Sequence, residues 1–144
     1  MPSKVIIVTY SELALKSSPV RHLMEKRLTE DIRAMQKLHG VSSVSIRKTG
    51  GRIFLETPNY EQTILAASKV FGVNSVIPAV KTSTAKDELV QTATEFASQV
   101  IRSGQTFAVR VRRVGEHPYT GMDLEKKIGA RILDSLHGQG VKVK

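Results

Sequence analysis

The first part of the chain combines a short apolar run with a long helical pattern. Residues 4–9 are a β-branched run that predicts a buried strand. Ser18 followed by Pro19 is typical of an N-cap and a first helical residue. Apolar residues then recur at helical spacing, namely Val20, Leu23, Met24, Leu28, Ile32, Met35 and Leu38. We therefore expect a strand followed by an amphipathic helix that ends at Gly40.

The next two segments predict a hairpin. Residues 41–48 and 52–57 have strand character and flank Gly50 and Gly51. A glycine pair readily supplies the positive φ angles that a tight hairpin needs. Phe54 is the one aromatic residue in these two strands, so we do not expect broad stacking of bases on the sheet.

A second helix and a further strand complete the first half. Residues 60–71 predict a helix that Gly72 ends, and residues 73–80 predict a strand. Pro78 indicates that this strand lies at an edge or contains a bulge. The order strand, helix, strand, strand, helix, strand is the split βαβ pattern of a ferredoxin-like fold, which we assign to residues 1–80.

The second half predicts a smaller set of elements. Residues 84–103 form a helical pattern, residues 106–113 alternate as a strand, and residues 122–136 form another helix. Residues 141–144 (VKVK) begin a further strand pattern. We expect an α/β (α+β) protein in which residues 81–144 form a second domain that lacks its C-terminal strands.

The strand at residues 106–113 has one charged face. Side chains alternate along a strand, so Phe107, Val109 and Val111 should face a core. The opposite face then carries Arg110 and Arg112, and Arg113 follows directly. These three arginines could solubilise an edge strand, but their position also suits phosphate binding.

The turn after this strand leads into a capped helix. Thr120 is a candidate N-cap and Asp123 stands three residues later, as in a capping box. Free N–H groups at a helix N-terminus favour phosphate. His117 and Tyr119 are turn residues that could pack locally or contact an exposed nucleotide. Lys126 and Lys127 could form a solvated face or contact RNA.

The charge of the chain favours a polyanionic partner. Its 144 residues carry 22 Lys and Arg against 13 Asp and Glu, a formal net charge of +9 with a pI of about 10.0. Both halves are basic, and apolar residues recur throughout, unlike in a disordered basic arm. Nucleic acid is the first candidate.

Other classes of protein fit the composition less well. No apolar run approaches the roughly 18 residues of a membrane span, so we expect a cytoplasmic protein without membrane contact. The chain has no cysteine, which excludes disulfides and thiolate metal sites within these residues. The four histidines show no metal-binding spacing. We expect no metal, cofactor or catalytic residue in this chain.

Three segments resemble the N-terminal part of tRNA 4-thiouridine synthetases, the tRNA sulfurtransferases that are also tied to thiamine biosynthesis. Residues 11–21 (SELALKSSPVR) resemble the opening pattern Gly-Glu-aliphatic-x-aliphatic-Lys, with Ser11 where the family usually has glycine. Residues 107–129 are similar to the centre of the THUMP domain, an RNA-binding module. Residues 70–80 (VFGVNSVIPAV) resemble the junction between the two domains.

The resemblance implies the tRNA-holding part of a tRNA-thiolating enzyme, with a truncated THUMP domain. It implies contact with the single-stranded end of the tRNA acceptor stem, and an anion contact at Lys16 and Arg21. The family's ATP-binding loop and acceptor cysteine are not in these residues. Catalysis and ATP therefore belong to a domain that this chain lacks, which could be a separate catalytic subunit.

Two other functions stay open from the sequence. The ferredoxin-like frame hosts many unrelated activities, including small-molecule enzymes. The VKVK segment could instead leave a sheet edge that a second chain completes, as in a homodimer or an assembly module.

Overall fold

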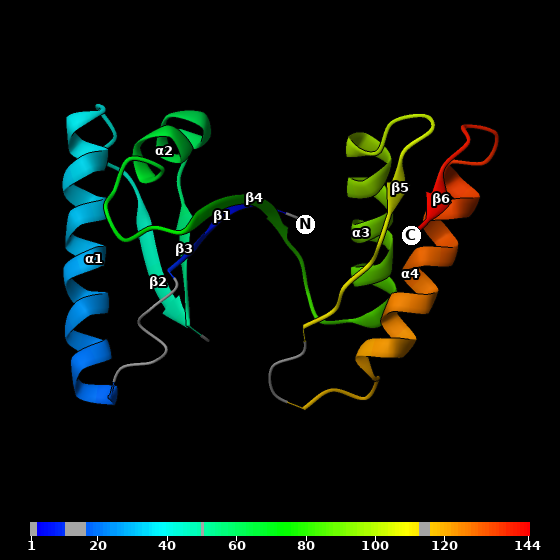
Figure 1. The fold of residues 1–144 in the computed structure, drawn as a ribbon, viewed down its shortest axis with the longest axis horizontal. Helices are drawn as coiled ribbons and strands as arrows, with labels where there is room; N and C mark the ends of the chain where they lie inside the picture. Colours follow the sequence, from blue (N-terminus) through cyan, green and yellow to red (C-terminus); the bar gives the residue numbers. More distant parts are fainter. Residues whose placement is uncertain (1–2, 11–16, 50, 113–115) are drawn as a thin grey trace. The chain divides into compact units, whose positions relative to one another are not determined.

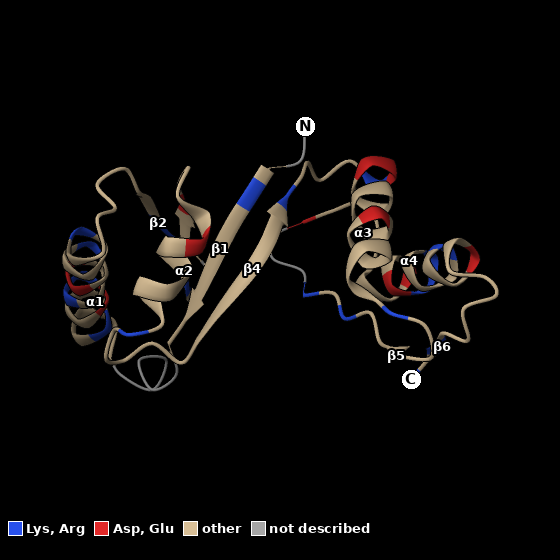
Figure 2. Ribbon diagram, turned by 90° about the horizontal axis from the view of Figure 1, so that it is seen from above, with Lys and Arg blue, Asp and Glu red and all other residues tan. Residues whose placement is uncertain are grey.

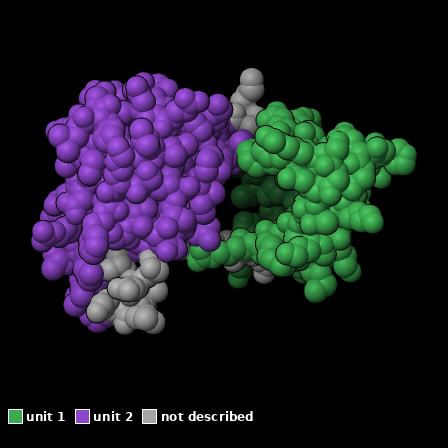
Figure 3. Space-filling model, turned by 45° about the horizontal axis from the view of Figure 1, so that its top comes forward, with its two compact units in different colours: residues 1–2, 82–144 green, residues 3–81 purple. Residues whose placement is uncertain are grey.

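The computed structural model describes residues 3–10, 17–49, 51–112 and 116–144. The chain forms two compact units, Ser3–Lys81 and Thr82–Lys144 (Figure 3). Each unit has its own hydrophobic core and is described by itself.

The first unit is a four-stranded antiparallel sheet with two helices (Figure 1). Its strands lie in the order β2-β3-β1-β4, which is the order of the split βαβ pattern. This confirms the predicted ferredoxin-like fold. The elements are β1 (Ser3–Thr9), α1 (Ser18–Leu38), β2 (Ser45–Thr49), β3 (Arg52–Glu56), α2 (Tyr60–Ala67) and β4 (Ser75–Lys81).

Strand alternation decides which side chains enter the first core. Ile6 and Val8 of β1 and Ile53 and Leu55 of β3 lie on the side that the helices cover, and all four are fully buried. Leu28 and Ile32 of α1 and Ala67 of α2 pack against them. Pro78 lies in β4 at the edge of the sheet, as its sequence context predicts.

Helix α1 buries a different stripe from the one predicted. Leu28 and Ile32 are buried, but Leu23 and Leu38 are 69% and 81% exposed. Glu25 and Gln36 enter the interior in their place because each finds a polar partner there.

Helix α1 also begins one residue earlier than predicted. Ser17 occupies the N-cap position, and its side chain makes no capping hydrogen bond.

The partner of Glu25 is a tyrosine at the end of β1. The Tyr10 hydroxyl donates a hydrogen bond to the Glu25 carboxylate, and both side chains are buried. Burial raises the pKa of Tyr10, and the bond and charge of Glu25 raise it further, whereas Arg21 opposes the shift. Gln36 is held similarly, because its Nε2 donates to the Thr63 carbonyl at 3.0 Å.

The second unit packs two helices against a short parallel strand pair. Its elements are α3 (Lys86–Val100), β5 (Thr106–Phe107), α4 (Gly121–Ser135) and β6 (Lys142–Val143). The predicted strand over residues 106–113 is shorter than expected, because its partner β6 offers only two residues for pairing. The core combines Val90 and Ala97 of α3 with Leu124, Ile128 and Ile132 of α4 and with Leu136, the residue that caps α4. No helix in the described part of the chain is long and apolar enough to cross a membrane.

The buried Tyr10 hydroxyl predicts a loss of stability at alkaline pH. In the unfolded chain tyrosine releases its proton near pH 10, whereas the raised pKa keeps Tyr10 protonated in the fold. The unfolded state then binds fewer protons, so Tyr10 should lower the free energy of unfolding by up to about 1.4 kcal/mol per pH unit above pH 10. Urea unfolding at pH 9 and pH 11 measures this fall in the free energy of unfolding. The fall should be smaller in Tyr10→Phe than in wild type, because phenylalanine has no hydroxyl to titrate.

Tyr60→Phe is the matched control, because Tyr60 is a half-buried tyrosine of the same unit. Equal losses of stability in wild type and Tyr10→Phe between the two pH values would show that the Tyr10 hydroxyl is not held as described.

Candidate nucleic-acid interface

The segment after β5 keeps its strand-like alternation although it forms no ladder beyond Phe107. Phe107, Val109 and Val111 are half-buried and pack against the second core, as predicted. Arg110 and Arg112 are exposed on the opposite side. Basic positions recur along the trace that follows β5 (Figure 2). Arg113 lies outside the described residues.

A carboxylate on α4 holds this segment in place. The Val111 N–H donates to Oε1 of Glu125 at 3.0 Å, so the backbone between the two arginines is tied to the helix. The start of α4 also touches this point, since a methyl group on Gly121 would lie 3.6 Å from Cγ1 of Val111. The backbone that carries the two arginines therefore passes beside the start of α4.

Glu125 was not identified from the sequence. On the helical pattern it stands beside the buried Leu124 and looks like an ordinary flanking charge. Its role is a side-chain bond to a backbone group 14 residues away, which no local periodicity indicates. One signal could have suggested such an acceptor. The alternating segment that follows β5 has more backbone N–H groups than a two-residue strand pair can bond, so some of them need a partner elsewhere.

A groove of about 380 Å³ lies between the extended segment, α4 and β6. Small residues form part of its wall, and three cations line it against the single carboxylate of Glu125. The cations are Arg110, Lys126 and Lys144. Lys144 was not among the predicted contacts. The remaining lining residues of the groove are Ala108, Val109, Gly129, Ala130, Leu133 and Val143.

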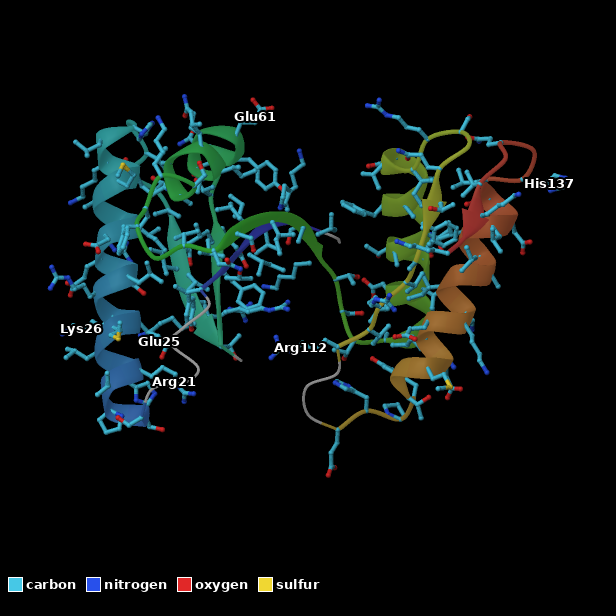
Figure 4. All side chains as sticks on the ribbon, in the orientation of Figure 1. Arg21, Glu25, Lys26, Glu61, Arg112 and His137 are labelled. Carbon is cyan, nitrogen blue, oxygen red and sulfur yellow. The ribbon has the colours of Figure 1, made fainter. Side chains whose placement is uncertain are left out.

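The cations differ in how far the protein itself neutralises them. Within the described part of the chain, Arg110 and Lys126 form no ion pair. Lys127 lies 3.8 Å from Asp87 of α3 rather than pairing with Asp123 along its own helix. Arg112 projects from the extended segment away from α4 (Figure 4) and has an interaction within the protein.

The turn residues have structural roles. Tyr119 is 8% exposed, and its hydroxyl donates to the Thr84 carbonyl at 2.8 Å. His117 is half-buried and stacks on Tyr119 with ring centroids 5.5 Å apart. The ring of Tyr119 thus belongs to the second core, and its hydroxyl ties the turn before α4 to the residues just before α3. Contact of His117 and Tyr119 with a nucleotide stays a prediction.

The predicted cap of α4 is confirmed. Thr120 has extended backbone angles, and its hydroxyl oxygen accepts a hydrogen bond from the Asp123 N–H at 3.1 Å. The cap fixes where the helix begins and thus where its remaining N–H groups lie beside Val111.

The predicted second contact lies in the other unit. Arg21 is half-buried in the first turn of α1, where its charge acts on Tyr10. Lys16 falls outside the described residues. The described residues include no group of three or more His, Asp or Glu side chains that could hold a metal ion.

The bond between Val111 and Glu125 predicts a protected backbone amide. Glu125→Ala removes the acceptor, and a bond to a charged group contributes about 1.5–3 kcal/mol. Hydrogen exchange at the Val111 amide, followed by NMR, should therefore accelerate at least tenfold. Glu125→Gln keeps an acceptor oxygen at the same reach and should give an intermediate rate. Unchanged exchange in Glu125→Ala would mean that other contacts hold the segment.

Comparison with known proteins assigns families to both units. The family of ThiI ferredoxin-like domains matches residues 5–76, and the THUMP domain family matches residues 83–144. Two relatives named "Probable tRNA sulfurtransferase" are 39% identical over 136 residues in Methanosarcina acetivorans and 36% identical over 138 residues in Methanosarcina mazei. They align with 94% and 96% of this chain. The chain spans about a third of their length, at 33% and 34%.

Two solved structures share the fold. PH1313 from Pyrococcus horikoshii Ot3 is 27% identical with a TM-score of 0.81, and the match covers 99% of this chain and 47% of that one. A 4-thiouridine synthetase in complex with RNA and bound ATP has a TM-score of 0.73, covering 98% of this chain and 35% of that one. At 20% identity the second likeness shows the fold alone. The ferredoxin-like family matches half of the 144 residues of this chain, and the match to the THUMP family covers the residues that follow. The chain therefore belongs to the ThiI ferredoxin-like family and carries a THUMP domain.

Proposed function

We propose that this chain is the tRNA-binding region of a tRNA-thiolating, 4-thiouridine-forming enzyme, and that it holds the acceptor end of the tRNA. The family assignment supports a role with tRNA, since curated relatives are named as tRNA sulfurtransferases and a structure with the same fold is a complex with RNA. The observation that carries the proposal is the groove beside α4, whose three cations face one carboxylate.

The groove suits a phosphate backbone for electrostatic reasons. Arg110 and Lys126 are exposed and have no ion pair among the described residues, so a phosphate need not displace a carboxylate to reach them. Glu125 uses one oxygen to accept from the Val111 backbone, and this bond positions Arg110 at the rim.

The size of the groove points to a free RNA end. Its volume of about 380 Å³ falls within the range of roughly 300–1,000 Å³ that small-ligand sites occupy, which suits one or two nucleotides. A paired stem is too wide to enter, so its phosphates would meet the exposed cations at the rim. Binding would depend on RNA shape and a single-stranded end more than on base sequence.

We assign the chemistry of thiolation to a part of the enzyme other than these 144 residues. The chain covers about a third of its curated relatives, so the reaction that their name denotes, with any ATP it uses, is assigned here to the remainder of such an enzyme. This region then contributes by positioning the substrate.

Removing Arg110 tests the electrostatic part of the proposal. Arg110→Ala should weaken binding to different tRNAs by a similar factor. It should also lower the slope of log affinity against log salt by about one, because one phosphate contact is lost. Fluorescence anisotropy across a salt series measures both. Arg33→Ala removes the same charge from the exposed face of α1 and is the control. Equal effects of the two variants would show that only net charge matters.

Filling the groove tests its shape without changing charge. Gly129 lines the groove on α4, and a Cβ added there has no heavy atom within 4 Å apart from the backbone of its own helix. Gly129→Leu should therefore fold, with a helix stabilised by up to about 1 kcal/mol because glycine is a poor helix former. It should weaken binding of an RNA with an unpaired end and leave a blunt duplex unaffected. Full binding of both RNAs would contradict the role of the groove.

A further inference from the structure

The first unit has a sheet face that its helices leave open. Side chains at paired positions of antiparallel strands point to the same side. Phe54 pairs with Ile7 of β1 and with Arg47 of β2, and Ile7 pairs with Ile77 of β4. These four residues therefore form one row across all four strands, on the side opposite the buried Ile6 and Leu55.

This row takes no part in the core beneath the helices. Phe54, Ile7 and Ile77 are absent from the core cluster, whereas their sequence neighbours Ile53 and Ile6 belong to it and Val76 packs against it. Ile77 is 40% exposed, and Phe54 and Ile7 are partly exposed. An aromatic ring in the middle of a sheet face, between an arginine on β2 and an isoleucine on β1, is more than the packing of this unit requires.

The charges around Phe54 are mainly positive. The Arg47 guanidinium carbon lies 5.1 Å from the centroid of the Phe54 ring, so two planar groups lie together on the sheet. Arg52 shares this face in the next paired row, opposite Thr9 and Thr49. Glu56 also lies on this face, but Lys81 neutralises it at 3.3 Å. The described residues give Arg47 and Arg52 no carboxylate partner.

We propose that this open face binds one unpaired RNA base, stacked on the Phe54–Arg47 pair, with the flanking phosphates near Arg47 and Arg52. Bases stack on aromatic rings and on guanidinium planes, and four-stranded sheets bind single-stranded RNA through aromatic residues on their central strands. Phe54 lies on β3, one of the two central strands. With a single aromatic residue, the site holds one base rather than a run of bases.

RNA fits this face better than a protein partner does. A specific protein interface needs about 800 Å² from each partner and excludes charge from its centre. Here the apolar row is three residues long, and two cations without carboxylate partners flank its ring. The inference rests on the proposed function in one respect, namely that the partner is RNA, but it uses a different unit of the chain.

The test compares Phe54→Leu and Phe54→Trp in the full chain. Leucine keeps apolar volume but removes the flat ring, whereas tryptophan keeps a stacking surface. The probes are a fluorescein-labelled single-stranded hexanucleotide of RNA and a fully paired RNA hairpin of matched charge. Phe54→Leu should weaken the single-stranded probe at least about fivefold and leave the hairpin unchanged, and Phe54→Trp should bind like wild type. Circular dichroism spectra and thermal unfolding confirm that each variant is folded.

The outcomes separate this proposal from the groove. If Phe54→Leu binds the single-stranded probe like wild type while Arg110→Ala weakens it, the sheet site is wrong and the groove stands. If neither variant weakens binding, both proposals fall. If Phe54→Leu instead removes a concentration-dependent dimer seen by light scattering, the face is a contact between two copies of this chain, and the RNA site is overturned.

Discussion

The position of the basic groove depends on one contact, between the extended segment that follows β5 and helix α4. Beyond Phe107 this segment has no strand partner, so its backbone must be held by other means. Val109 and Val111 pack into the core between the helices, and the Glu125 carboxylate accepts the Val111 N–H. These contacts turn Arg110 and Arg112 outward. Without them Arg110 would not be held in one position and could not share a defined site with Lys126.

Both units combine an apolar core with a few polar contacts that fix its geometry. In the first unit the buried Glu25 accepts a hydrogen bond from Tyr10, and the side-chain amide of Gln36 donates to the Thr63 carbonyl. In the second unit the hydroxyl of Tyr119 ties the start of α4 to the start of α3 through Thr84. Each bond determines where a helix lies, and therefore which basic side chains reach the surface together.

Local pattern was enough to predict the elements and the outward arginines. The run at β1, the glycine hairpin, the edge proline Pro78 and the Thr120 cap all depend on residues close together in the chain. Alternation also predicted the exposure of Arg110 although the ladder itself is short, because burial of Val109 and Val111 needs only an extended backbone.

Contacts between distant residues were beyond this kind of prediction. The buried face of α1 includes Glu25 because Tyr10 approaches it from another element, and helical spacing alone favours the apolar Leu23. The burial of Tyr119 could not be predicted either, because the acceptor of its hydroxyl, the Thr84 carbonyl, is 35 residues away. Glu125 escaped notice for the same reason, since its partner is a backbone N–H that carries no residue-type signal.

The most direct test is an NMR titration of the isotope-labelled chain with an acceptor-stem RNA that carries a single-stranded end. The account predicts that the backbone amides of residues 108–112 and 121–130 shift together and reach saturation at one RNA concentration. Removing the single-stranded end should reduce the shifts at Gly129 and Ala130, which line the groove. If these residues stay unperturbed while RNA binds elsewhere on the chain, the groove beside α4 is not the RNA site.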